Sequence, residues 1–75
     1  METIMERLID VLFDVRKRTV MIKCYNSFNE EVYLCKGSGD DIASFLSSEI
    51  LLRKIKSQKL GDNGEMIIAI DLMLN

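Results

Sequence analysis

The side chains with the clearest capacity for chemistry in this sequence are cationic. Seven of the ten Lys and Arg residues stand in two short runs, at positions 16–18 and 53–59. Clustered cations can contact nucleic-acid phosphates or an acidic protein surface. Lysines on an edge strand also prevent sheets from associating edge to edge, a role that needs no ligand. The candidate binding residues are Arg16, Arg18, Arg53, Lys54, Lys56 and Lys59.

Two features argue against nucleic acid as the ligand of these cations. The formal net charge is −2, and no pair of aromatic residues stands among the basic runs to stack on bases. We therefore interpret these cations first as edge protection and solvated charge, then as a nucleic-acid surface, and last as a surface for an acidic protein partner.

Groups for acid–base or nucleophilic catalysis are sparse. The sequence has no histidine, the side chain used most often as a general base. The acid pairs at positions 30–31 and 40–41 flank a predicted turn and a predicted helix start, where carboxylates are solvated. Ser47 and Ser48 have no histidine to activate them. We predict that the protein is not an enzyme.

Neither the glycines nor the cysteines form a recognisable ligand site. Residues 37–39 read Gly-Ser-Gly before a predicted helix, but Asp40 and Asp41 would repel a phosphate there. Cys24 and Cys35 lack a C-x-x-C spacing and are expected to be reduced packing residues. No set of Cys, Asp and Glu has the spacing of a metal site, so we predict no cofactor and no metal.

The first segment predicts an amphipathic helix over residues 3–17. Its apolar side chains recur every three or four positions, and acids lie at its start while bases lie at its end, as the helix dipole favours. The stripe consists of Ile4, Met5, Leu8, Ile9, Val11, Leu12 and Val15.

A β-hairpin is predicted next. Residues 19–25 and 31–35 are rich in β-branched and aromatic types, with turn-forming residues between them. If Asn26 faces Glu30 across a three-residue loop, Cys35 points away from Cys24. The predicted cross-strand pairs are Cys24 with Val32, Lys23 with Tyr33, and Ile22 with Leu34.

A short second helix follows the hairpin. The turn at residues 37–41 is expected to end the second strand, and Ser38 with Asp41 predicts an N-cap. The helix ends near residue 48, and its apolar face consists of Ile42, Phe45 and Leu46.

The last third of the chain predicts a second hairpin. Residues 51–56 fit either a helix extension or the start of a strand. We prefer a strand from about residue 52 to 60, because Gly-Asp-Asn-Gly at 61–64 is a strong hairpin signal. With a two-residue turn at 63–64, the predicted pairs are Leu60 with Ile67, Lys56 with Asp71, and Ile55 with Leu72.

Together these elements predict a single α+β domain over residues 1–75 in the order αββαββ. The expected sheet is four-stranded and largely antiparallel, with both helices on one face. The last strand, residues 65–73, is apolar on both faces, and helices on one side cover only one of them. The other face is a candidate surface for a partner or a homodimer, with a small molecule at such an interface left open. Its candidate residues are Ile67, Ala69 and Met73.

The chain shows no targeting signal. Its start is acidic, where a secretory signal needs a basic region, and no apolar run approaches the length of a membrane span. We expect a cytoplasmic protein with no membrane partner.

The order of segments resembles a known group of proteins. Thr-Val-Met-Ile-Lys-Cys-Tyr, Glu-Val-Tyr-Leu-Cys-Lys-Gly, a short Asp-Asp-Ile-Ala-Ser-Phe-Leu helix and a closing Gly-Asp-Asn-Gly-Glu-Met-Ile-Ile-Ala-Ile strand follow one another. This pattern resembles small uncharacterised proteins encoded by phages and mobile elements of Gram-positive bacteria, although the Ile-Pro that often opens their short helix is absent. The resemblance implies a compact accessory protein, without catalytic residues, that binds a host or phage component.

The functional hypothesis follows from these observations. We expect a non-enzymatic module that binds and occludes a partner protein, as an inhibitor, an anti-defence factor or a regulatory factor. The alternative is a nucleic-acid-binding accessory protein that uses the basic strand around residues 53–59.

Overall fold

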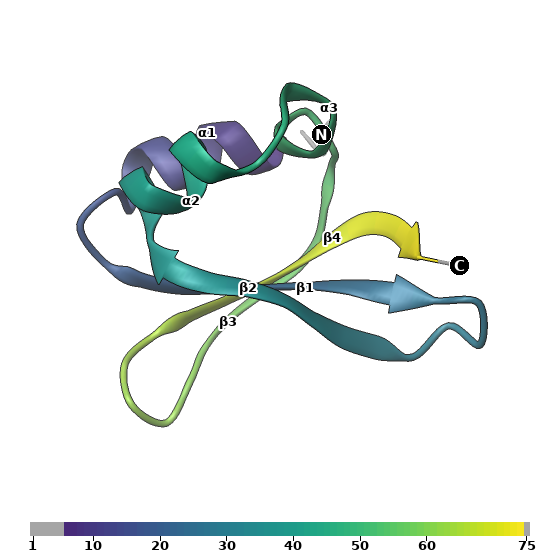
Figure 1. The fold of residues 1–75 in the computed structure, drawn as a ribbon. Helices are drawn as coiled ribbons and strands as arrows, with labels where there is room; N and C mark the ends of the chain where they lie inside the picture. Colours follow the sequence, from purple (N-terminus) through teal and green to yellow (C-terminus); the bar gives the residue numbers. More distant parts are fainter. Residues whose placement is uncertain (1–5, 75) are drawn as a thin grey trace, which may run out of the picture.

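The computed structural model describes residues 6–74 (Figure 1). In it, strands with alternating apolar residues pack against helices that each have one apolar stripe. The predicted α+β fold with a four-stranded sheet is confirmed, and a short third helix, α3, was not predicted. The elements in chain order are α1 (Leu8–Asp14), β1 (Thr19–Asn26), β2 (Glu31–Ser38), α2 (Gly39–Phe45), α3 (Ser48–Leu51), β3 (Ile55–Leu60) and β4 (Met66–Leu74).

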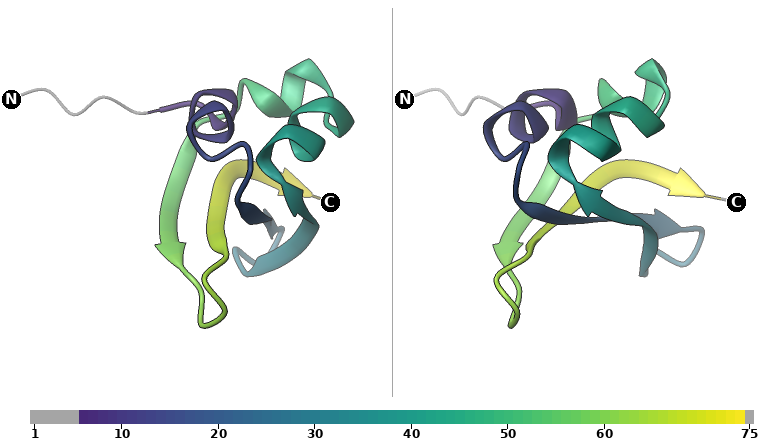
Figure 2. Two further views of the ribbon diagram at one scale, coloured as in Figure 1. Left: turned by 90° about the vertical axis from the view of Figure 1, so that its left-hand side faces the viewer. Right: turned by 60° about the vertical axis from the view of Figure 1, so that its left-hand side comes forward.

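The sheet joins the two predicted hairpins side by side. The strand order is β2-β1-β4-β3, so β2 and β3 form the two edges. Both hairpins are antiparallel, while the central strands β1 and β4 run parallel to each other. The helices lie on one face of this twisted sheet (Figure 2). The other face, called the open face below, is not covered by any helix within residues 6–74.

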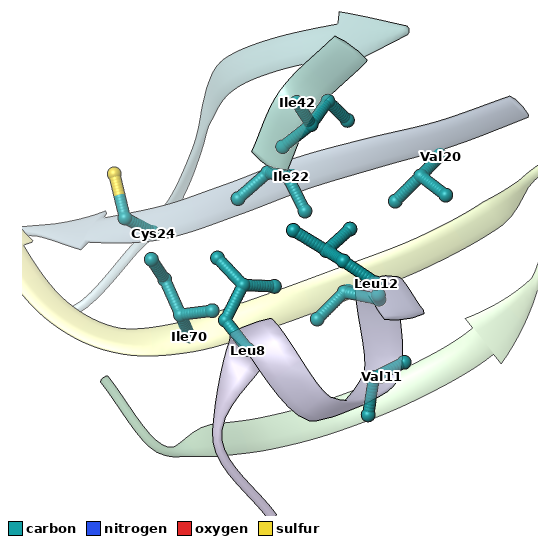
Figure 3. Close-up of a cluster of buried hydrophobic side chains, with 9 residues drawn as sticks. Leu8, Val11, Leu12, Val20, Ile22, Cys24, Ile42 and Ile70 are labelled. Carbon is teal, nitrogen blue, oxygen red and sulfur yellow. The ribbon is translucent and has the colours of Figure 1, made fainter. Parts of the chain in front are cut away.

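The core lies between the central strands and the helical layer (Figure 3). It is entirely aliphatic apart from one cysteine, and its side chains are almost fully buried. Each large aliphatic side chain buried in this way stabilises the fold by about 1.5–3 kcal/mol. The predicted inner face of β4 is confirmed, because Ile68 and Ile70 belong to the core and Met66 and Leu72 pack against it. The core residues are Leu8, Val11, Leu12, Val20, Ile22, Cys24, Ile42, Ile68 and Ile70.

The first helix is shorter than predicted. Ile4 and Met5, at its expected start, lie outside the described residues, and Arg7 has an extended backbone. The amide of Leu8 donates to the carbonyl of Arg53 at 2.9 Å, and the amide of Ile55 donates to the carbonyl of Glu6 at 2.9 Å. Residues 6–8 therefore pair with residues 53–55. The helix begins only at Leu8, because the backbone groups of the residues before it are already used in this pairing.

The first hairpin closes as predicted. The amide of Asn26 donates to the carbonyl of Glu30 at 3.0 Å across a three-residue loop. The side-chain oxygen of Asn26 accepts hydrogen bonds from the amides of Phe28 and Glu30. Asn29 adopts a left-handed φ of 64°, which asparagine tolerates better than most residues. Cys24 then faces Val32 and Lys23 faces Tyr33, so both of these predicted pairs are confirmed.

Beyond these pairs the predicted register is wrong. A β-bulge shifts the pairing between Ile22 and Lys23, so Ile22 faces Cys35 and not Leu34. Leu34 and Cys35 both pack against the core that contains Cys24, which overturns the prediction that Cys35 points away from Cys24. A bulge places two consecutive residues opposite one partner and breaks the strict alternation of a strand. Both cysteines are nevertheless free thiols, as predicted.

The second strand and second helix also differ from the prediction in their limits. β2 continues through Gly37 to Ser38 and is not ended by a turn. Ser38 caps α2 as predicted, since its hydroxyl accepts from the amide of Asp41 at 3.1 Å. Ile42 is buried and Leu46 packs against the core, but Phe45 is 77% exposed, so its place in the apolar face was wrong. α2 ends at Phe45, about one turn before the predicted end near residue 48.

The ambiguous segment 51–56 begins at the end of α3, which is a separate helix and not an extension of α2, and it enters β3 at Ile55. Leu51 ends α3, which Ser47 caps by accepting from the amide of Ile50 at 3.4 Å. The strand starts at Ile55, later than the predicted residue 52, because residues 53 and 54 pair with the segment before α1.

The register of the second hairpin is one residue away from the prediction near the turn and two residues away at Ile55, where it shifts again. The amide of Gly61 donates to the carbonyl of Glu65 at 2.7 Å, which encloses a three-residue loop with Gly64 at φ 82°. Such a loop combines a tight turn with a left-handed glycine, whereas the predicted two-residue turn needs a second residue with positive φ. Leu60 therefore faces Met66, and the predicted pairs of Leu60 with Ile67, Lys56 with Asp71 and Ile55 with Leu72 are wrong.

Close packing of α1 and α2 depends on Gly39. A Cβ atom at this position would lie 2.7 Å from the Cα of Arg16 and 2.8 Å from the carbonyl oxygens of Leu12 and Val15. These are backbone atoms that cannot move aside singly. The amides of Gly39 and Asp40 donate to the carbonyls of Arg18 and Arg16 at 3.2 and 2.9 Å, which fixes the approach.

We predict that Gly39→Ala lowers the free energy of unfolding by about 1–3 kcal/mol, the usual range for overpacking a close contact. Urea denaturation measures the loss. Gly37→Ala is the control, because the nearest atoms to its Cβ lie at 3.7 Å and the expected change is within about 0.5 kcal/mol. Equal effects of the two substitutions would contradict the packing described here.

Candidate functional site

The predicted partner residues of β4 lie on the open face, but they form a narrow strip. Ala69 is only 1% exposed, because Lys23 and Ser57 lie opposite it on the neighbouring strands. Ile67 is half-buried, whereas Met73 is 57% exposed. Lysine stems cover apolar surface in this way while their charges stay in water. Ile67, Ala69 and Met73 alone therefore do not make a wide apolar patch.

The predicted basic residues are distributed over three places. Lys56 and Lys59 belong to the edge strand β3, whereas Arg53 and Lys54 precede it beside the start of α1. The third place is the connection from α1 to β1. A shallow hollow lies there, lined by its three basic residues together with Asp14 and Val15. Arg16 and Arg18 lie there with Lys17, and their carbonyls hold the start of α2. The six residues do not form one cationic surface.

The structure gathers a different set of side chains on the open face, and the sequence analysis did not name them as a site. Lys23 and Tyr25 of β1 lie on this face because their neighbour Cys24 is buried in the core. Tyr33 lies opposite Lys23, and Lys36 lies opposite Met21. The alternation of buried and exposed residues along β1 places Lys23 and Tyr25 on the same face, and this alternation was visible in the sequence. The pairing of Lys23 with Tyr33 was itself predicted.

An apolar groove runs along the outer edge of β2, where α2 passes above it. Its cavity volume is about 490 Å³. The bulge contributes its floor, since Leu34 and Cys35 are two consecutive residues that both turn toward the helical side. Ile42 and Phe45 of α2 form the opposite wall. The remaining lining residues are Tyr33, Lys36 and Asp41.

All three phenylalanines of the chain are exposed, and they differ in their surroundings. Phe28 occupies the tip of the first hairpin loop and Phe13 lies on α1, with the Arg16 guanidinium 5.6 Å from the centre of its ring. Phe45 lines the groove together with Leu34 and Tyr33, which is 61% exposed. Large exposed apolar residues that converge on one concavity are typical of an interaction site. The groove is therefore the strongest candidate site in the described part of the chain.

The edge of β2 adds backbone groups to this site. β2 has no strand partner on its outer side among residues 6–74, so about half of its amides and carbonyls point away from the sheet. Register shifts occur at both edges, but β3 carries two like charges, Lys56 and Lys59, and lysines on an edge strand discourage strand pairing. β2 differs from β3 because its two charged residues, Glu31 and Lys36, have opposite signs and because the apolar groove lies beside it.

Residues 6–74 offer few groups suited to metal binding, thiol chemistry or membrane insertion. No group of three or more Cys, Asp and Glu side chains there is placed to hold a metal ion. Burial raises the pKa of the Cys24 thiol and of the Cys35 thiol, which disfavours the nucleophilic thiolate. None of the helices within this range has the length and apolar content needed to span a bilayer.

Comparison with known proteins gives no relative. No protein-family model matches the chain, and no curated protein or solved structure matches it significantly. The resemblance to phage and mobile-element proteins stays a prediction, and function has to be argued from the site itself.

The raised thiol pKa values predict a pH dependence of stability. The folded chain holds the Cys24 proton more tightly than the unfolded chain, so this contribution is fully present below the unfolded pKa of about 8.5 and is lost above it. The loss is at most about 1.4 kcal/mol per pH unit for one thiol. In Cys24→Val this contribution is absent.

We therefore expect the difference in unfolding free energy between wild type and Cys24→Val to be constant between about pH 6 and 8. Above about pH 9 it should shift in favour of the variant. Urea titrations at each pH measure the difference. A difference that does not change with pH would show that the Cys24 thiol is not protected by burial.

Proposed function

We propose that this protein is a non-enzymatic binding module that takes up an extended segment of a partner protein along β2. The groove between β2 and α2 carries this proposal, because it combines an open strand edge with apolar side chains beside it. In this mode of recognition the backbone hydrogen bonds give affinity and the side-chain pockets give specificity.

The dimensions and lining of the groove suit a peptide. Its volume of about 490 Å³ falls in the range of roughly 300–1,000 Å³ that is usual for sites that hold a drug-sized ligand. Leu34, Ile42 and Phe45 would contact a large apolar side chain of the segment. Lys36 and Asp41 flank this apolar centre with one charge of each sign, as in the polar rim of many interfaces.

Occlusion is the mechanism that such a site supports. A segment held as an added strand is no longer available to its own protein, so a small module can inhibit or regulate without catalysis. This agrees with the accessory role implied by the resemblance to phage and mobile-element proteins. A cytoplasmic location and an anti-defence role remain predictions from the sequence.

Selection from a random peptide library on the immobilised protein tests the proposal. We expect enriched peptides to share alternating apolar residues, as an extended strand requires. Their binding should shift the backbone amide resonances of β2 and α2 in nuclear magnetic resonance spectra. Phe45→Ser should weaken the affinity for the selected peptides by about tenfold or more, because it removes a central apolar contact.

Phe28→Ser is the matched control, since Phe28 is 81% exposed and Phe45 is 77% exposed, but Phe28 lies on the hairpin tip away from the groove. Peptides that bind both variants equally would refute the groove as the site. Self-association that Phe45→Ser abolishes would show that a second copy of this chain, and not a partner segment, occupies β2.

A further inference from the structure

The open face of the sheet concentrates side chains that are rare elsewhere in the chain. Both tyrosines of the protein lie on it, together with four of its six lysines. All four arginines lie elsewhere. The four lysines come from three different strands, so no run of consecutive basic residues marks the face in the sequence. They are Lys23, Lys36, Lys56 and Lys59.

The positions of the two tyrosines differ. The Nζ atom of Lys56 lies 4.8 Å from the centre of the Tyr25 ring, a cation–π contact that holds the Lys56 side chain over the face. Tyr25 is half-buried, whereas Tyr33 is 61% exposed. Tyr25 therefore positions a cation, and Tyr33 presents a ring on which another planar group can stack.

A hollow of about 450 Å³ lies on the same face. Lys36 from one edge strand and Lys59 from the other both line it, and Met21 and Ile67 form its apolar floor between them. An apolar floor between two cations suits a nucleotide strand, because a base can lie on the floor while the neighbouring phosphates reach the cations.

Carboxylates on this side of the sheet stand mainly at its ends. Glu31, beside the first hairpin loop, pairs with Lys23 at 3.8 Å. Asp62 and Glu65 line the hollow from the second hairpin loop, and Asp71 lies on β4 between two inward-facing residues. The middle of the face is left to Lys36, Lys56 and Lys59 around the apolar floor.

We propose that the open face binds single-stranded nucleic acid, with phosphates on the lysines and a base on Tyr33. This face lies on the side of the sheet opposite α2, and it shares Tyr33 and Lys36 of the edge strand β2 with the groove. It differs from the basic strand considered in the sequence, of which only Lys56 and Lys59 contribute. Single strands suit the site better than a duplex, because stacking on an exposed ring requires an unpaired base.

Fluorescence anisotropy with a labelled oligothymidylate of about ten nucleotides tests this inference. Three lysine–phosphate contacts, from Lys36, Lys56 and Lys59, predict a slope of log affinity against log salt of about −2, at roughly −0.7 per contact. Lys36→Gln and Lys59→Gln should each reduce the slope by about 0.7. Tyr33→Leu should weaken binding by about 5- to 100-fold, and Tyr33→Phe should restore it.

Lys17→Gln is the control, since Lys17 is an exposed lysine on the α1–β1 connection away from the sheet face. Circular dichroism of each variant verifies the fold. The inference fails if no binding is seen at about 50 mM salt, or if Lys17→Gln acts like Lys59→Gln. It also fails if a duplex binds as tightly, or if polyglutamate competes as well as the oligonucleotide, which would indicate an acidic protein partner.

Discussion

The parallel pairing of β1 with β4 is the constraint on which the rest of this structure depends. Each strand belongs to its own hairpin, and the two hairpins are far apart in sequence. Their pairing brings Val20 and Ile22 beside Ile68 and Ile70, which α1 covers with Leu8 and Leu12. A hairpin alone is marginally stable in water, so these shared aliphatic contacts hold both in one fold. The same pairing makes β2 and β3 the two edges.

The two edges and the two faces then acquire different properties. β3 carries lysines and is poorly suited to strand pairing, whereas β2 joins an apolar groove beneath α2. The helical face is closed by the core, and the open face collects cations and tyrosines from strands that are distant in sequence. Both candidate surfaces thus follow from the strand order and not from any local motif.

Local signals in the sequence were sufficient for much of the fold. The strands, the Ser38 cap and the Asn26–Glu30 closure follow from short-range chemistry that acts within a few residues. The bulge at Leu34 and the left-handed Gly64 each changed a register, because one additional residue moves every later pair. The site was largely hidden, since Phe45 was assigned to the core and the lysines of the open face converge only after β1 and β4 pair. Hydrophobic periodicity does not encode which strands become neighbours.

Amide hydrogen exchange of the free protein tests the central claim, that the β2 edge is open for binding, most directly. Amides of β1, and those of β4 at residues 66–70, have strand partners on both sides and should exchange slowly. In β2 we expect alternation, with inward amides protected and outward amides exchanging at rates close to those of the hairpin loops. Uniform protection along β2 would contradict the account, because it would mean that the proposed binding edge is already covered.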